Sequence, residues 1–186
     1  MKILFFGFGR FQKIRKNPSS KIAKDLARLL EKSFETDSII LPSSASCWKI
    51  LEKKIRQFKP EAIIGFGIAS GRASVCIERI ALNLKPSRKK SLERISPKKP
   101  LALEARLDIE KLLKAVKGIP TRISYYAGTS YCNFVYYNLL ANFPKKSIFV
   151  HIPLTFRKDR IAKAQKPEVD SKRISNALKK AIIKTF

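Results

Sequence analysis

Acidic residues are scarce in this 186-residue sequence, in which fourteen Asp and Glu stand against forty Lys and Arg, for a formal net charge of +26. The basic excess is spread evenly along the chain, so no basic tail can be set apart as a nucleic-acid arm. A charge of this size attracts polyanions in a salt-dependent way. Aromatic residues do not alternate with the basic ones, as they do on surfaces that bind single strands. We therefore favour a generally lysine-rich surface, and non-specific nucleic-acid binding stays open.

Cysteine, histidine and long apolar runs are also rare. Three cysteines cannot build a disulfide framework, and they favour a reducing compartment. A single histidine without a carboxylate cluster speaks against a metal site, and no cofactor is expected. The longest apolar runs, near residues 1–8 and 62–69, fall short of the roughly 20 residues of a membrane span. The N-terminus has no signal-peptide cleavage pattern, so we expect a cytoplasmic protein without membrane contact.

The 45% apolar content is enough for one compact domain over residues 1–186. Short apolar runs alternate with amphipathic segments, which predicts an α/β fold: a three-layer αβα sandwich around a mixed, mostly parallel sheet. Residues 85–100, rich in Lys, Arg, Ser and Pro, are expected to form a mobile basic loop. The expected strands are 2–6, 37–41, 62–66, 75–84, 122–125 and 147–152, and the expected helices begin near 17 and cover 46–58, 107–116, 130–143 and 170–183.

Three residues that are far apart in the sequence could carry chemistry. Cys132 follows a Gly-containing turn at an expected helix start, a position that predicts a lowered pKa of its thiol. His151 is the only histidine and ends a strand; it could serve as the base of a cysteine nucleophile or be a satisfied core residue. Glu78 lies in an apolar run, where it could pair structurally with Arg72 or Arg79, or orient the imidazole.

Two glycine-containing turns invite comparison with nucleotide-binding loops. Residues 67–72 lack the Lys and Ser or Thr of a phosphate-binding loop, and residues 7–9 lack the third glycine of a dinucleotide fingerprint. We therefore expect no nucleotide cofactor. The turns still matter, because ligand sites in α/β folds gather beyond the carboxyl ends of strands.

A resemblance covers nearly the whole chain. The segments that carry it are 7–13 (G-F-G-R-F-Q-K), 17–19 (N-P-S), 67–72 (G-I-A-S-G-R), 77–83 (I-E-R-I-A-L-N), 118–133 (G-I-P-T-R-I-S-Y-Y-A-G-T-S-Y-C-N) and 151–153 (H-I-P). In order and spacing they are similar to the motifs of the pyrrolidone-carboxylate (pyroglutamyl) peptidases, a cysteine peptidase family. The segments around the Glu and the Cys are the most specific.

The resemblance implies a peptidase that removes N-terminal pyroglutamate from peptides through a triad of Glu78, Cys132 and His151. Cys132 would attack the carbonyl carbon, His151 would move the proton, Glu78 would orient His151, and water would clear the acyl-enzyme. The resemblance also assigns substrate-binding residues: Phe8 and Phe11 around the lactam ring, Asn17, Ile68, Ser130 and Tyr131 along its polar edge, and Arg88 nearby.

Departures from the family motifs fall in the segments that would hold the substrate. Arg10, Gln12 and Lys13 replace a proline and two glycines of the first loop, and the connection across residues 97–106 is short. Two alternatives therefore stay open: a family member with changed acyl specificity, and an inactive member that binds a polyanion such as RNA. The resemblance also implies a homotetramer, which the strongly basic charge opposes.

Overall fold

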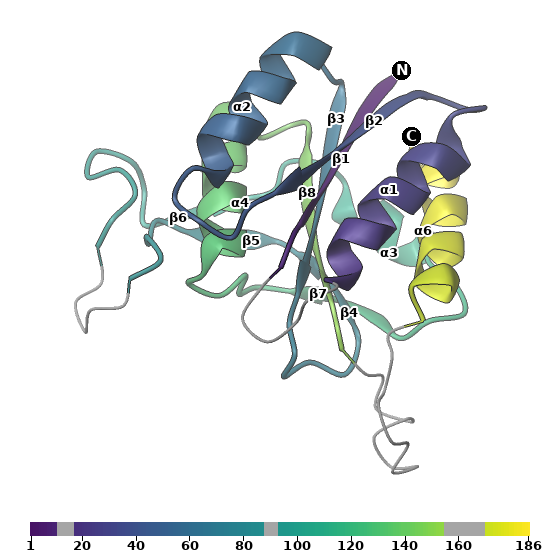
Figure 1. Cartoon of the computed structure of the whole chain (residues 1–186). Coiled ribbons are helices and arrows are strands. Elements are labelled where there is room, and N and C mark those ends of the chain that lie inside the picture. Colours follow the sequence, from purple (N-terminus) through teal and green to yellow (C-terminus); the bar gives the residue numbers. More distant parts are fainter. Residues whose placement is uncertain (11–16, 88–92, 155–169) are drawn as a thin grey trace.

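The computed structural model describes residues 1–10, 17–87, 93–154 and 170–186. Its centre is a six-stranded sheet of order β2-β1-β3-β8-β4-β7 (Figure 1). The first four strands of that order are mutually parallel; β4 and β7 are parallel to each other, and β4 runs antiparallel to β8. The predicted α/β fold with a mixed, mostly parallel sheet is thus confirmed. The strands are β1 (Lys2–Phe8), β2 (Glu35–Leu41), β3 (Ala62–Ile68), β4 (Val75–Glu78), β7 (Thr121–Ser124) and β8 (Ser147–Ile152).

Helices cover both faces of the sheet, as the three-layer prediction requires (Figure 1). Helices α1 (Pro18–Leu30), α3 (Ile109–Ala115) and α6 (Ser171–Thr185) pack together on one face, and α2 (Cys47–Phe58) and α4 (Tyr131–Asn142) lie on the other. No helix in the described part of the chain is both long and apolar enough to cross a bilayer.

Short polar side chains fix where three helices begin. Asn17, Asp108 and Asp170 accept hydrogen bonds from backbone N–H groups in the first turns of α1, α3 and α6. Each bond satisfies one of the N–H groups that a helix start leaves without a partner. The cap at Asp170 is the one that the sequence predicts.

The apolar run at 75–84 is extended, as expected, but it forms two strands. It breaks at Arg79, whose N–H donates to the Ser124 carbonyl and whose carbonyl accepts from Ala105. The second half, β5 (Ile80–Leu82), leaves the main sheet and pairs antiparallel with β6 (Ala102–Glu104). Strand β6 was not expected from the sequence, because three residues give too little alternation to detect.

Part of the expected mobile loop at 85–100 is described by the structure. Its residues 88–92 lie outside the described ranges. On either side, the Lys85 N–H donates to the Glu93 carbonyl at 2.7 Å, and the buried Asn83 amide bonds to three backbone carbonyls between residues 96 and 100. Mobility of the loop stays a prediction.

Helix α4 is attached to the strands by two buried polar side chains. The Asn133 amide accepts from the Leu82 N–H at 2.7 Å and donates to the Leu82 carbonyl at 2.9 Å. One turn later, the Tyr136 hydroxyl donates to the carbonyl of Glu78 at 2.7 Å. The first turn of α4 is therefore fixed relative to β4 and β5 before any side chain of the site is considered.

Replacing Asn133 by alanine should show how much this attachment contributes to the free energy of unfolding. Asn133→Ala leaves the part-buried N–H of Leu82 without its partner and removes the amide donor to the Leu82 carbonyl, so we expect a loss of about 1–3 kcal/mol in the free energy of unfolding. Urea denaturation followed by circular dichroism measures it. The matched control is Asn142→Ala, which removes an exposed amide of the same helix and should change stability by less than about 0.5 kcal/mol. Equal effects of the two variants would contradict this assignment.

Candidate active site

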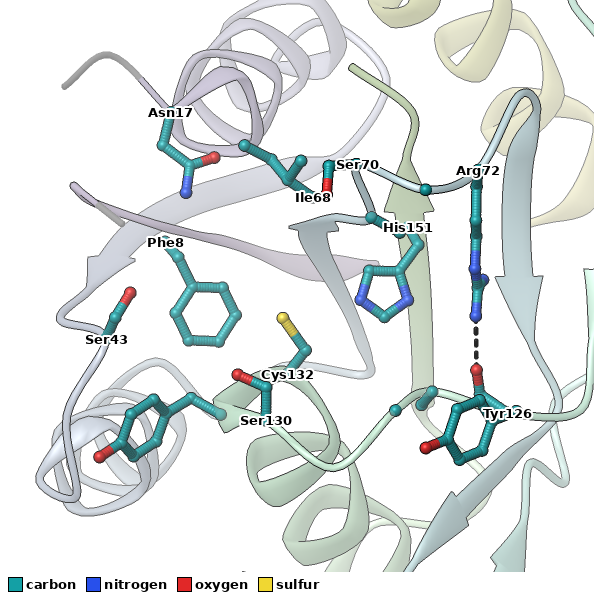
Figure 2. A pocket seen from close by; sticks show the side chains of 15 residues that line it. Phe8, Asn17, Ser43, Ile68, Ser70, Arg72, Tyr126, Ser130, Cys132 and His151 are labelled. Atoms are coloured by element: carbon teal, nitrogen blue, oxygen red, sulfur yellow. Dashed lines mark hydrogen bonds between the residues drawn. The ribbon is translucent and has the colours of Figure 1, made fainter. Parts of the chain in front are cut away.

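The site lies where the carboxyl ends of three parallel strands meet the start of α4. Phe8, Ile68 and His151 come from the ends of β1, β3 and β8, and Cys132 is the second residue of α4. They line one pocket of about 370 Å³ (Figure 2). This is within the size range of small-molecule sites, and its place beyond strand ends is where α/β folds bind ligands.

Glu78 and His151 are joined by the register of β4 against β8. Glu78 lies opposite Phe149, and His151 is two residues further along β8, so both side chains leave the same face of the sheet. Glu78 Oε1 lies 2.7 Å from His151 Nδ1. Both residues are buried, Glu78 completely, and the Phe149 ring packs edge-on against the imidazole with its centroid 5.0 Å away. The ring orientation of His151 is therefore set by a carboxylate on one side and an aromatic ring on another.

Cys132 has room for its thiol because Gly67 lies beneath it. Gly67 pairs with His151 across β3 and β8. A Cβ at Gly67 would lie 2.7 Å from the Cys132 Sγ and 3.0 Å from the Phe149 ring. Figure 2 shows the thiol between the Phe8 ring and the imidazole, with one ring nitrogen of His151 turned toward it. The absence of a side chain at Gly67 thus allows the Cys132 thiol and the His151 imidazole to lie side by side.

The sequence predicts a lowered pKa for the Cys132 thiol, and this prediction is wrong. Burial raises this pKa to about 12, and the Cys47 thiol and the Glu78 carboxylate act in the same direction. The backbone N–H at the helix start and Arg72 act in the opposite direction but are outweighed. Burial therefore favours the neutral thiol of Cys132, and a nucleophile forms only if a base takes its proton.

Five of the expected substrate-binding residues lie around this pocket. They are Phe8, Asn17, Ile68, Ser130 and Tyr131. The Asn17 amide is already engaged, because it donates to the Gly9 carbonyl at 2.9 Å and accepts from Ser19. It thereby fixes the end of β1 that carries Phe8. The other two expected residues, Phe11 and Arg88, lie outside the described residues.

Four polar or aromatic lining residues were missed by the sequence reasoning: Ser43, Ser70, Arg72 and Tyr126. Arg72 was considered only as a structural ion-pair partner of Glu78. It does pair with Glu78 Oε1, and its second terminal nitrogen donates to the Tyr126 carbonyl at 2.5 Å. Its place in the G-x-A-x-G-R segment was the available signal. For Ser43 and Tyr126 the sequence carried no signal, since their loops meet the pocket only through the fold.

Metal chemistry finds no support in the described residues, since no cluster of three or more His, Cys, Asp or Glu side chains there could hold an ion. The side chains brought together are a thiol, an imidazole and a carboxylate. This set is sufficient for nucleophilic catalysis of acyl transfer, with the imidazole as base and the carboxylate as its orienting partner.

Comparison with known proteins supports the same conclusion. The family model for pyroglutamyl peptidase matches residues 1–186. The chain belongs to the pyroglutamyl peptidase family, whose members are cysteine peptidases. It is 35% identical to the pyrrolidone-carboxylate peptidase of Pyrococcus furiosus over 90% of this chain and 88% of that protein. It is 33% identical to that of Bacillus subtilis, over 82% and 78%.

Solved structures of the family have the same fold. A mutant pyrrolidone carboxyl peptidase from Pyrococcus furiosus matches with a TM-score of 0.84 and 33% identity, covering 100% of this chain and 98% of that one. The pyroglutamyl peptidase I of Bacillus amyloliquefaciens matches with a TM-score of 0.84 and 28% identity, covering 99% and 96%. The chain therefore has the fold of these solved structures, although its sequence is strongly basic.

A methyl group at Gly67 should separate nucleophile from base. Gly67→Ala pushes the new Cβ against the Cys132 Sγ, so we expect kcat/KM to fall at least about 100-fold. The control is Gly9→Ala, where a Cβ meets nothing closer than 3.7 Å and activity should be retained. Steady-state kinetics and thermal melting of both variants make the measurement. A fully active Gly67→Ala enzyme would disprove the close contact.

The raised pKa of Cys132 predicts how its alkylation depends on pH. Because only the thiolate reacts, the iodoacetamide rate at Cys132 in the free enzyme should rise about tenfold per pH unit between pH 7 and 9, without a plateau. Mass spectrometry of the peptide carrying Cys132 separates it from Cys47 and Cys76. A plateau at neutral pH would instead reveal a thiolate–imidazolium pair before substrate binds.

Proposed function

We propose that this protein removes N-terminal pyroglutamate from peptides, with Cys132 as nucleophile, His151 as general acid and base, and Glu78 as the residue that orients His151. The observation that carries the proposal is the shared pocket: Cys132 and His151 line it side by side, with Glu78 2.7 Å behind the imidazole. Family membership supports the substrate class.

The reaction begins with a neutral thiol. As the Cys132 Sγ attacks the carbonyl carbon that joins pyroglutamate to the next residue, its proton passes to His151 Nε2. Glu78 holds Nδ1 and stabilises the imidazolium that forms. The C–N bond then breaks, the amine leaves with the proton from His151, and a pyroglutamyl thioester remains on Cys132. A water molecule, activated by the neutral imidazole, hydrolyses the thioester and restores the thiol.

The start of α4 can stabilise the oxyanion of the tetrahedral intermediates. The Ser130 side chain accepts no hydrogen bond from the first turn of this helix. Backbone N–H groups at a helix start are directed outward and carry partial positive charge. They lie beside the Cys132 Sγ, where the carbonyl oxygen of a bound substrate would be held.

The pocket suits the pyroglutamyl ring, which is small, flat and uncharged. Phe8 offers an aromatic wall that is almost fully buried, and Figure 2 shows its ring next to the Cys132 thiol. The lactam has one N–H and two C=O groups, so a few polar partners on the rim satisfy it. A charged N-terminal residue would lose its hydration in this pocket without gaining a counter-ion from Phe8 or Ile68.

Hydrolysis of a pyroglutamyl coumarin amide tests the proposal. Wild-type protein should release coumarin with reductant present, and Cys132→Ser and His151→Ala should each lose at least about 1,000-fold in kcat, since the unit acts as a whole. Cys47→Ala, which removes a buried thiol outside the pocket, is the matched control and should retain activity.

Two outcomes would contradict the proposal. Turnover that survives in Cys132→Ser would remove Cys132 from the mechanism. No turnover by folded wild-type protein, at low and at physiological salt, would show that this pocket does not take the pyroglutamyl group, and other acyl groups would then be screened.

A further inference from the structure

We propose that Arg72 is a positioning residue of this site, whose forked guanidinium fixes the Glu78 carboxylate and the turn before Cys132 relative to each other. The inference deepens the proposed peptidase function and rests on it. Arg72 lies in the loop between β3 and β4, and it reaches across the pocket to the loop between β7 and α4 (Figure 2).

The first arm of the fork places a cation beside the buried Glu78 carboxylate. Glu78 has no exposed surface. Its Oε1 lies within hydrogen-bond distance of both His151 Nδ1 and Arg72 Nη1. Its Oε2 has no hydrogen-bond partner among the described residues. A buried carboxylate without a cation takes up a proton rather than remain charged. Burial opposes the charge of Arg72, but attraction to Glu78 outweighs it and raises the pKa of Arg72 above its usual value.

The contact of the Glu78 carboxylate with His151 Nδ1 bears on which ring nitrogen carries the proton. A carboxylate can only accept, so Nδ1 must be the protonated nitrogen and Nε2 keeps its lone pair toward Cys132. A neutral Glu78 carboxyl could donate to Nδ1 instead. The proton would then sit on Nε2, and His151 could no longer take the proton of the thiol.

The second arm holds the turn that precedes Cys132. The Tyr126 carbonyl accepts from Arg72 Nη2 at 2.5 Å, and the chain then turns through Gly128, at φ +83°, into the first turn of α4. One planar guanidinium thus contacts both the Glu78 carboxylate and the turn that leads to Cys132. A lysine could keep the charge beside Glu78, but a single ammonium lacks the fork that reaches both acceptors.

A purely structural ion pair is the competing interpretation, and Arg79 provides its matched control. Arg79 follows Glu78 directly, its side chain is 17% exposed like that of Arg72, and it pairs with two carboxylates, Glu104 and Glu110. As the next residue in an extended chain it leaves the opposite side. A structural role alone would make the two arginines equivalent in every measurement at the site.

The imidazole itself gives the decisive readout, because His151 is the only histidine in the chain. Protein labelled with ¹⁵N in histidine shows one imidazole, whose two nitrogen shifts report which nitrogen carries the proton. The neutral form should carry it on Nδ1 in wild type and in Arg79→Met. In Arg72→Met the signal should move toward the Nε2-protonated form. An unchanged Nδ1-protonated signal in Arg72→Met would overturn the proposal.

Steady-state kinetics and chemical rescue by guanidinium test the role of Arg72 a second time, with more than one variant. Arg72→Met should lower kcat at least about 100-fold, with KM changed less than about threefold, and Arg72→Lys should fall between it and wild type. In Arg72→Ala, millimolar guanidinium should restore at least about tenfold in kcat, because the side chain it replaces lies partly open to solvent. Urea at the same concentration should restore nothing.

These readouts separate the proposal from the function on which it rests. The nitrogen shifts are measured on free protein, so they test Arg72 even if pyroglutamyl amides are not hydrolysed. An inactive wild type with the expected shifts would refute the substrate and leave the role of Arg72 standing. Equal losses in Arg72→Met and Arg79→Met, without guanidinium rescue of Arg72→Ala, would refute the role of Arg72.

Discussion

The Glu78 carboxyl group is completely buried, and the geometry of the site follows from the groups that bind it. One oxygen receives the imidazole of His151 and the guanidinium of Arg72 together. The carbonyl of the same residue receives the Tyr136 hydroxyl from α4. Strand β4, the His151 imidazole, the Arg72 guanidinium and helix α4 are thereby all connected through Glu78. A buried carboxyl group is costly unless it is paired, and the partners of Glu78 are the same groups that the proposed mechanism needs aligned.

The second constraint is steric and comes from β3. Gly65 and Gly67 are two residues apart in β3, so a side chain at either would point to the same face of the sheet. The Phe6 ring fills the space over Gly65, and the Cys132 thiol fills the space over Gly67. The close packing that follows also raises the pKa of the thiol. Burial therefore favours a protonated, unreactive cysteine. In the proposed mechanism His151 takes the thiol proton only during attack, and a thiol that is otherwise neutral resists oxidation and alkylation.

Much of this could be predicted from the sequence, for reasons that particular residues show. The strand expected at 62–66, which the structure has as Ala62–Ile68, and the cap at Asp170 follow from local rules of hydrophobic pattern and helix capping. The expected triad residues came from a resemblance, because Glu78, Cys132 and His151 are far apart in the chain and only the register of β4 with β8 joins two of them. The pKa of Cys132 could not be foreseen, since the helix start favours the thiolate and burial, which is a tertiary property, outweighs it. The sequence pointed to Arg72 as a possible partner of Glu78 but not to a role in the site. Its second contact, with the Tyr126 carbonyl, joins residues 54 positions apart and depends on the fold.

The most direct test of the account is the mass of the protein caught during turnover. Wild-type enzyme mixed with a pyroglutamyl amide and quenched in acid within milliseconds should carry one pyroglutamyl group in thioester linkage, and peptide mapping should place it on Cys132. Treatment with hydroxylamine should remove it. A protein that turns over substrate without ever carrying the acyl group, or that carries it on Cys47 or Cys76, would contradict the assignment of Cys132 as the nucleophile.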